Sequence, residues 1–286
     1  MGKEIEEIEV VKEKHTFRII FFLVLLIIIL LIVYGFFLGN TGMIIKEYDI
    51  ENSSIPTSFD NLKIAHFSDI IYKDTKDLEK VKNAVEKIND KKVDIVVFSG
   101  GLVDKNYKLN EKEMIQISTE LKKINSTYGK YYVSGSDDKE IQVYDTIMQN
   151  GDFISLNDNI DIIYSKLKES ILLVGVDYKS NLGFLNEKLK DKENMFKIVI
   201  FHESDEIDDL KNYNFNMALS GNSLNGQINI PIIKDILLPE NSKNYYNPYY
   251  KVDNTDLYIS SGIGTRKIDF RLFNKPSVNI YVFKKM

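Results

Sequence analysis

Polar segments follow several of the apolar runs in this 286-residue chain, and they contain residue types that could bind a divalent cation. The side chains in question are Asp69, Asp137, Asp138, His202 and Asn222. Carboxylate and amide oxygens are the ligands that Mg²⁺ and Ca²⁺ prefer, and an imidazole can join such a set. One ion held in this way could assist hydrolysis of a phosphoester, but the set leaves the general acid and base unassigned.

Composition limits the metal chemistry that the chain could perform. It has no cysteine and three histidines, which excludes disulfide scaffolds and thiolate zinc sites and leaves an imidazole-rich metal centre short of ligands. The 42 acidic and 37 basic residues give a net charge of −5 at pH 7. That charge offers no long-range attraction to nucleic acid, and we predict no nucleic-acid partner.

The elements that must position these residues are predicted from hydrophobic periodicity. Segments 77–91 and 111–123 have apolar residues at helical spacing. Short apolar runs predict strands at 62–67, 94–99, 130–135, 171–176, 197–202, 216–221, 257–262 and 279–283. Strands that alternate with helices indicate an α/β domain, in which ligands bind at the carboxyl ends of the strands. The polar segments follow those ends, although Gly, Ser, Asp and Asn also form ordinary turns there.

The N-terminal segment predicts a membrane anchor. Residues 19–38 carry no charge and have the length that an α-helix needs to cross the hydrocarbon core. No small-residue cleavage site follows, which favours an uncleaved signal anchor. Lys12, Lys14 and Arg18 precede this segment and Lys46 alone follows closely, so we expect a single-pass protein of the cell membrane with a cytoplasmic tail at 1–18. A linker with the first elements is expected at 39–60, and one extracytoplasmic domain at 61–286.

Seven sequence blocks, taken in order, carry a family resemblance. They are IAHFSDII, VDIVVFSGGLVD, YGKYYVSGSDD, ILLVGVD, FKIVIFHESD, MALSGNSLNGQI and LYISSGIGT, and they extend over about residues 62–283. The chain thereby resembles bacterial calcineurin-like metallophosphoesterases, in particular those with one N-terminal membrane span. The resemblance implies a four-layer α/β/β/α sandwich of two packed mixed sheets. It also implies a pair of divalent cations, bridged by an aspartate, that activate a water molecule.

Most of the ligand positions that the resemblance implies hold other residues in this chain. Asp69 and His202 are retained, which makes two of seven. The changed positions are Ile71 for a histidine, Gly101 for the bridging aspartate, Ser136 for an asparagine, and Asn222 and Leu224 for two histidines. Asp137 stands where the family has its catalytic histidine. Because loss of even one residue that supports a ligand typically costs about 10–100-fold in metal affinity or activity, a working two-metal hydrolase is not expected.

Three hypotheses follow. The leading one is a non-catalytic phosphoesterase-fold domain without a cofactor, which binds an unidentified protein or a phosphorylated ligand at the cell envelope. The alternative is a metal-dependent phosphoesterase with a remodelled site, in which Asp138 and Asn222 join Asp69 and His202 around a single Mg²⁺, Mn²⁺ or Ca²⁺ ion. The third is an architectural component of an envelope complex, recruited through the apolar helix or a tyrosine-rich loop at 245–250. The same loop could instead pack over the edge of the sheet.

The resemblance also implies a basic residue that could contact a phosphate, and this chain lacks it at the matching position. The segment 260–262 reads Ser-Ser-Gly where the family often has Ser-Arg-Gly. Arg266 and Arg271 follow nearby, and either could take its place.

Overall fold

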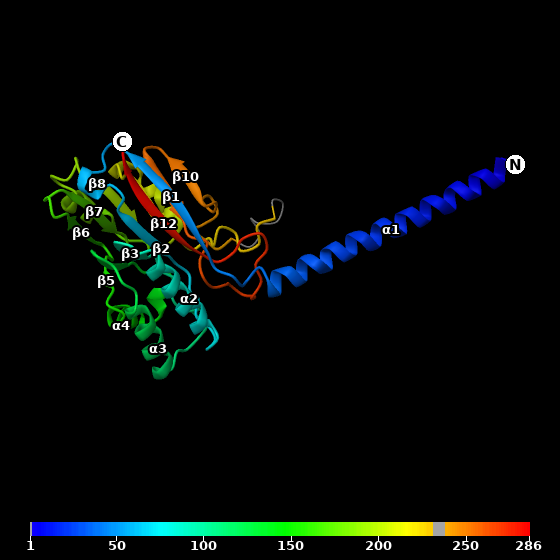
Figure 1. Ribbon diagram of the computed structural model, residues 1–286, viewed down its shortest axis with the longest axis horizontal. Helices are drawn as coiled ribbons and strands as arrows, with labels where there is room; N and C mark the ends of the chain where they lie inside the picture. Colours follow the sequence, from blue (N-terminus) through cyan, green and yellow to red (C-terminus); the bar gives the residue numbers. More distant parts are fainter. Residues whose placement is uncertain (1, 231–237) are drawn as a thin grey trace.

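The computed structural model describes residues 2–230 and 238–286, with side chains from residue 15 onward. A long helix, α1 (Gly2–Phe37), projects away from a domain built on two sheets (Figure 1). Within the described ranges, the stretch His15–Phe37 of α1 is the one helical segment long and apolar enough to cross a membrane, and almost none of it is covered by the domain. Insertion in a bilayer would remove this apolar surface from water.

The described strands form two six-stranded sheets. The first has the order β1 (Ile44–Asn52), β12 (Ser277–Lys285), β2 (Lys63–Phe67), β3 (Ile95–Phe98), β4 (Gly129–Tyr132) and β5 (Ile154–Ser155). The second has the order β10 (Tyr249–Val252), β11 (Thr255–Ile259), β9 (Met217–Ser220), β8 (Phe196–Ile200), β7 (Ser170–Gly175) and β6 (Asn159–Tyr164). The strands β2, β3 and β4 are parallel, as are β7, β8, β9 and β11. Their carboxyl ends therefore reach a common edge within each sheet.

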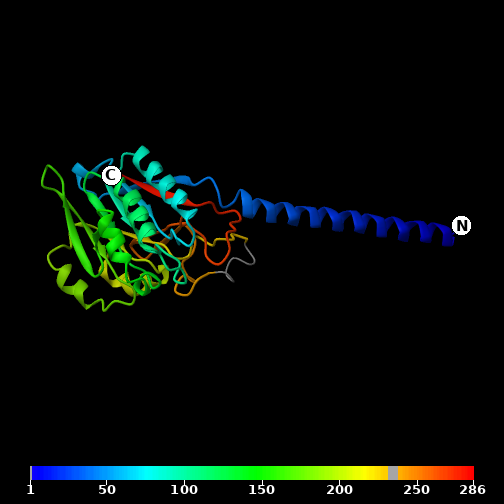
Figure 2. The same cartoon turned by 90° about the horizontal axis from the view of Figure 1, so that it is seen from below.

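Helices cover the outer faces of both sheets, which gives the predicted four-layer sandwich (Figures 1 and 2). The first sheet packs against α2 (Asp77–Asp90), α3 (Glu111–Lys122) and α4 (Tyr144–Asn150). The second packs against α5 (Gly183–Lys188) and α6 (Ile207–Leu210). A third apolar cluster fills the space between the two sheets. Each sheet thus has an apolar layer on both faces, which explains why its central strands read as continuous apolar runs.

Local sequence features account for the two longer helices of the domain. Val81, Val85 and Ile88 recur at helical spacing on α2 and are buried against the first sheet. The helix α3 begins with a capping box, in which Asn110 and Glu113 each accept a hydrogen bond from the backbone N–H of the other. These two helices match the predicted ranges closely.

The predicted strands are all present, with small shifts at their ends, but the prediction missed β1, β5, β6 and β10 and the short helices α4, α5 and α6. The strands β1 and β6 alternate polar and apolar residues and are half-exposed, so they lack a continuous apolar run. β1 pairs in parallel with β12 along its whole length, from Ile44 beside Ser277 to Asn52 beside Lys285. This pairing joins the segment that follows α1 to the first sheet.

The end of α1 packs against the loop that precedes β12. The backbone N–H of Arg271 donates to the Gly35 carbonyl oxygen at 3.1 Å. The ring of Phe36 meets that of Phe270 edge to face, with 5.0 Å between centroids. Gly39 lies so close that a Cβ on it would be 1.9 Å from the Arg271 carbonyl oxygen. Helix and loop therefore form one packed junction.

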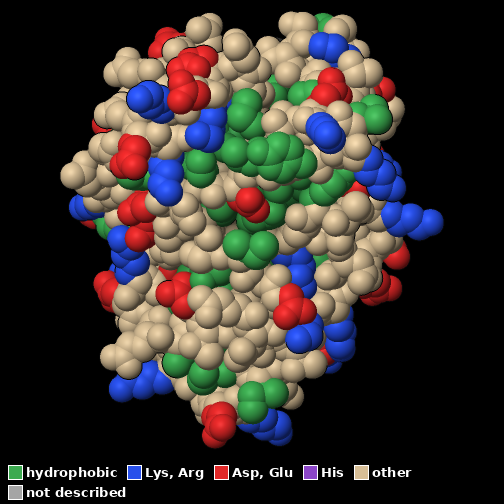
Figure 3. All heavy atoms as spheres, turned by 90° about the vertical axis from the view of Figure 1, so that its left-hand side faces the viewer, with side chains coloured by type: hydrophobic (Ala, Val, Ile, Leu, Met, Phe, Trp, Pro, Cys, Tyr) green, Lys and Arg blue, Asp and Glu red, His purple; other side chains and the backbone are tan. Residues whose placement is uncertain are grey.

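The face of the domain that is turned away from α1 has mixed charge (Figure 3). Basic and acidic side chains lie interspersed around a patch of apolar side chains in the upper half of that view. Such mixing produces no extended field of one sign over this face.

His66, on β2, is a buried structural residue between the sheets. Its Nδ1 lies 3.2 Å from the hydroxyl oxygen of Tyr281, and its Nε2 lies 2.8 Å from that of Ser99. Burial, with a smaller contribution from His202, lowers the pKa of His66 to about 3. Burial thus keeps the imidazole neutral, and the two hydroxyl groups are the partners of its ring nitrogens.

We predict that His66 makes the domain less stable as the pH falls below about 6.5. Between that value and the folded-state pKa of about 3, the imidazole binds a proton in the unfolded chain but not in the folded one, so acid favours unfolding. The contribution is at most about 1.4 kcal/mol per pH unit. His66→Asn should therefore reduce the slope of unfolding free energy against pH, measured by urea denaturation. His15→Asn, at an exposed histidine, is the matched control, and equal slopes for both variants and the parent would contradict the prediction.

Candidate functional site

Polar segments from both sheets meet at one edge of the domain. In the first sheet, segments 68–69, 100–101 and 136–138 follow β2, β3 and β4; in the second, segments 202–203, 221–223 and 260–266 follow β8, β9 and β11. Hydrogen bonds cross between the sheets. The backbone N–H of Asn222 donates to Asp69 Oδ2 at 3.0 Å, and that of Ser136 donates to Glu203 Oε1 at 2.8 Å. The structure therefore gathers the polar residues singled out in the sequence into one site.

The guanidinium of Arg266 lies among these side chains. Its Nη2 donates to Asp69 Oδ1 at 3.3 Å and to Asn222 Oδ1 at 2.7 Å. Its Nη1 donates to Asp137 Oδ2 at 3.2 Å. A guanidinium carries its donors in a planar fork, so one arginine can serve several oxygen atoms at once. One fixed positive charge thus contacts three side chains named in the sequence analysis. Asp69 and Asn222 are candidate ligands there, and Asp137 stands at the position of the family's catalytic histidine.

Asp69 requires a nearby cation because its carboxylate is fully buried. The Ser68 hydroxyl donates to Oδ2 at 2.5 Å, in addition to the Asn222 N–H. On the other oxygen, Oδ1, the Arg266 contact is accompanied by His202, whose Nε2 lies 3.7 Å away. Both carboxylate oxygens therefore have protein partners.

His202 is buried beside that carboxylate. Its Nδ1 lies 2.5 Å from the Ser99 carbonyl oxygen. Burial alone would lower the pKa of His202, but the carboxylates of Asp69, Glu203 and Asp138 outweigh that effect and raise it. The imidazole is thus placed to carry a positive charge within an acidic surrounding.

Asp138 is held by three backbone amides. Its Oδ2 accepts from the N–H groups of Gly101 and Gly135 at 2.7 and 2.9 Å, and its Oδ1 accepts from Leu102 at 2.9 Å. Burial raises the pKa of Asp138 to about 6, although the charge of His202 and these three N–H groups act in the opposite direction. The carboxyl group connects the loops after β3 and β4, which occupies most of its capacity to accept further bonds.

The remaining positions add no cation ligand through their side chains. Ile71 and Leu224 are buried and have left-handed φ values of 47° and 54°. At Gly101, also left-handed with φ 81°, a Cβ would lie 2.9 Å from Asp69 Oδ1. A side chain there would displace the Asp69 carboxylate from its present position. Ser136 takes part through its backbone N–H.

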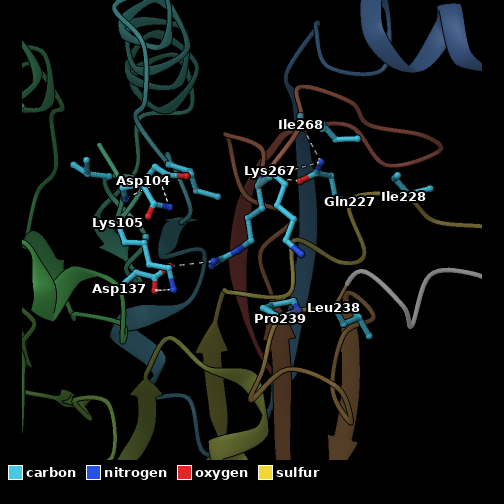
Figure 4. Close-up of a pocket in the computed structure, with 14 residues that line it drawn as sticks. Asp104, Lys105, Asp137, Gln227, Ile228, Leu238, Pro239, Lys267 and Ile268 are labelled. Atoms are coloured by element: carbon cyan, nitrogen blue, oxygen red, sulfur yellow. Dashed lines mark hydrogen bonds and ion pairs between the residues drawn. The ribbon is translucent and has the colours of Figure 1, made fainter. Parts of the chain in front are cut away.

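A cavity of about 380 Å³ opens beside Arg266 (Figure 4). Its charged lining consists of Asp104, Lys105, Asp137, Arg266 and Lys267. Its apolar lining consists of Ile71, Val103, Ile228, Leu238, Pro239 and Ile268. The volume lies in the range of small-molecule sites, which combine an apolar wall with a few polar groups.

Comparison with known proteins places this site in a family. No family model matches the chain. Over 250 residues the chain is 30% identical to YkuE, an uncharacterized metallophosphoesterase of Bacillus subtilis, with 83% of this chain and 84% of that protein covered. The chain belongs to the metallophosphoesterases. A second metallophosphoesterase of B. subtilis, YkoQ, is 25% identical over 235 residues, covering 77% and 83% of the two chains. Among solved structures, the calcineurin-like phosphoesterase YfkN from B. subtilis aligns with a TM-score of 0.39 and 11% identity, over 76% of this chain and 90% of that chain.

Metallophosphoesterases typically depend on divalent metal ions, but the residues of this member do not fit a metal pair. Over residues 15–230 and 238–286, whose side chains the structure describes, no group of three or more His, Cys, Asp or Glu side chains could hold a metal ion. Arg266 already supplies positive charge to Asp69 Oδ1, and a metal ion on the same oxygen would be repelled by it. The Asp138 carboxyl is committed to backbone N–H groups. The donor set therefore suits an internal arginine better than two cations.

The two arginines noted in the sequence have different roles in this metallophosphoesterase. Arg271 is fully buried and donates to the carbonyl oxygens of Ser261, Gly262 and Gly264. Burial lowers the pKa of Arg271 to about 10. Arg271 thus fixes the backbone of the loop that carries Arg266. The sequence alone does not choose between them, because neither arginine lies near Asp69 in the chain.

The tyrosine-rich loop packs on the domain at the edge of the second sheet, beside β10. The ring of Tyr245 meets that of Tyr250 edge to face, with 5.1 Å between centroids. The Tyr250 hydroxyl accepts hydrogen bonds from the backbone N–H groups of Tyr246 and Asn247. These contacts give the loop a structural role within the chain.

We predict that Arg266→Gln destabilises the domain by about 1.5–3 kcal/mol, because it leaves the buried Asp69 carboxylate without its hydrogen-bonded cation. The free energy of unfolding from urea denaturation measures the loss. Adding Asp69→Asn should recover part of it, because the uncompensated charge is then gone.

Lys267→Gln is the matched control for Arg266→Gln, since it removes a positive charge from the next residue of the same loop. It should change the unfolding free energy by less than about 0.5 kcal/mol. Similar losses for the two variants, or fully additive losses in the double variant, would show that the Asp69–Arg266 pair has no special role.

Proposed function

We propose that this metallophosphoesterase is a non-catalytic, membrane-anchored domain that binds a ligand or partner at the cell envelope. The observation that carries the proposal is the Arg266 guanidinium, which contacts Asp69, Asn222 and Asp137 together. A hydrolase of this family needs cations that polarise phosphoryl oxygens and lower the pKa of water. A guanidinium supplies charge and hydrogen bonds, but it cannot activate a water molecule by coordination.

The degenerate positions support the same conclusion. The bridging aspartate of the family is replaced by Gly101, and the catalytic histidine by Asp137, which pairs with Arg266 and, at 3.5 Å, with Lys105. The Asp137 carboxylate is thus engaged in ion pairs at the position where the family has an imidazole as general acid. Binding functions require neither a metal pair nor a general acid, and the site keeps the charge and the cavity that they use.

Anchoring is proposed from α1. Its exposed apolar stretch His15–Phe37 and the basic residues before it favour a single membrane crossing with residues 1–18 in the cytoplasm and the two-sheet domain outside. The packed junction between α1 and the loop before β12 would then hold the domain close to the membrane surface.

We expect the full chain, purified in mild detergent and dialysed, to contain less than about one-tenth of an equivalent of Mn²⁺, Zn²⁺, Mg²⁺ or Ca²⁺ by elemental analysis, since donors for a metal pair are lacking. Turnover of an aryl phosphodiester with each added metal should equal that of the Asp69→Ala and His202→Ala variants. An active phosphodiesterase assayed in the same detergent controls for inhibition.

Metal-dependent turnover that both variants abolish would contradict the proposal. Together with about one bound ion per chain, that outcome would favour the remodelled single-cation phosphoesterase instead, with Asp69, His202, Asp138 and Asn222 as its candidate ligands.

A further inference from the structure

Among the residues that the structure describes, Lys267 is the cation of the cavity beside Arg266 that has no ion-pair partner. Asp137 lies between Lys105 and Arg266, at 3.5 and 3.2 Å, and Arg266 also pairs with Asp69, so these two cations and two carboxylates compensate one another. Lys267 forms no ion pair with any residue of the described ranges 2–230 and 238–286, and its side chain extends into the cavity (Figure 4). Asp104, from the opposite wall, accepts hydrogen bonds within its own turn from Asn106. The cavity thus presents a free ammonium to an incoming anion.

A second polar group near this ammonium also lacks a partner. The Nε of Arg266 is buried and makes no hydrogen bond within the described chain. Buried donors without an acceptor are uncommon in folded proteins, so the Arg266 guanidinium has an unused capacity to donate. A phosphate has several acceptor oxygens and two negative charges near neutral pH, which suits an ammonium and a guanidinium that line the same cavity.

Much of the remaining cavity lining is apolar and suited to hydrocarbon. Val103, Leu238 and Pro239 line the cavity together with Ile71, and Ile268 stands half-exposed beside Lys267. Ile71, Val103 and Leu238 are buried, whereas an ion alone would leave the half-exposed Ile268 in contact with water. A ligand with a charged head and an apolar chain would cover both kinds of surface at once.

The loop that carries Lys267 and Ile268 also contacts the apolar helix. Phe273, which is 60% exposed, lines a shallow apolar recess with Ile27, Leu30, Leu31 and Tyr34 of α1. The same loop meets Phe36 through Phe270. In a membrane-anchored chain these contacts would set the loop, and one wall of the cavity, at the bilayer surface.

We propose that this cavity binds an anionic membrane lipid with a phosphate monoester head, its phosphate on Lys267 and Arg266 and the start of its hydrocarbon chain along the apolar wall. This inference rests on the proposed membrane-anchored binding function and names its ligand. The lipid reaches the cavity from the bilayer that holds α1.

The first test uses the full chain in nanodiscs of phosphatidylcholine with a minor fraction of phosphatidic acid. Native mass spectrometry measures the lipid retained after ejection. The parent should retain phosphatidic acid in preference to phosphatidylcholine, and Lys267→Gln should reduce that retention about tenfold because a charge-assisted contact is lost. Lys190→Gln, which removes an exposed charge beside α5, should retain as much as the parent. Equal retention by Lys267→Gln and the parent would overturn the proposal.

The second test uses soluble probes to measure separately what the phosphate head and the hydrocarbon chain of the ligand contribute to binding. Calorimetric titration of the full chain in neutral detergent compares octyl phosphate with inorganic phosphate. Octyl phosphate should bind about tenfold or more tightly, and Ile268→Ser should weaken octyl phosphate alone. Equal affinities for the two probes would reduce the site to a simple anion site and overturn the lipid proposal. Octyl phosphate binding without retention of phosphatidic acid would overturn its membrane source.

The metal and turnover measurements on the same preparation keep the two proposals distinct. Selective lipid retention without turnover supports both. Absence of selective retention, in a chain that also lacks turnover, overturns the ligand assignment and leaves the non-catalytic function standing. Turnover of octyl phosphate with a bound metal would overturn the non-catalytic function, and with it the basis of the ligand assignment.

Discussion

The Asp69 carboxylate is fully buried at the meeting point of the two sheets, and a buried charge of this kind must be compensated or it destabilises the fold. In a two-metal enzyme the compensation comes from bound cations. Here it comes from within the chain, through Arg266, with Ser68 and the Asn222 N–H completing the partners of the carboxylate. The other polar residues of the site are arranged around this Asp69–Arg266 ion pair, whose cation belongs to the chain itself.

The position of the Arg266 guanidinium depends on both sheets. Asp69 follows β2 in the first sheet, whereas Arg266 follows β11 in the second. Arg271 fixes the loop after β11, which carries Arg266, by donating to the carbonyl oxygens of Gly262 and Gly264. Asp138 ties two neighbouring loops together through backbone N–H groups. These loops are thus ordered by internal hydrogen bonds, which fix the geometry of the site.

Much of this organisation could be predicted from the sequence, and the failures have physical causes. Strands such as β3 and β8, buried on both faces, are evident as apolar runs, and the motif after β2 locates Asp69 at a strand end. The half-exposed β1 gives no such run, and its pairing with β12 joins residues far apart in the chain. The same limitation applies to the site. Asp69 and Arg266 are 197 residues apart, so no local pattern reveals the ion pair, and Lys267 becomes notable only when the cavity is seen.

The junction at Gly39 restricts how the domain can move relative to α1. With the Arg271 carbonyl oxygen too close to allow even a Cβ at Gly39, and Phe36 packed on Phe270, the connection behaves as a stiff coupling rather than a flexible tether. A stiffly coupled domain samples a thin layer of space next to its anchor, so molecules in that layer have a high effective concentration while those in bulk solution gain nothing. In a chain whose α1 spans a membrane, encounter would be reduced from three dimensions to two, and weak intrinsic affinity for a molecule confined to the same surface would be sufficient for occupancy.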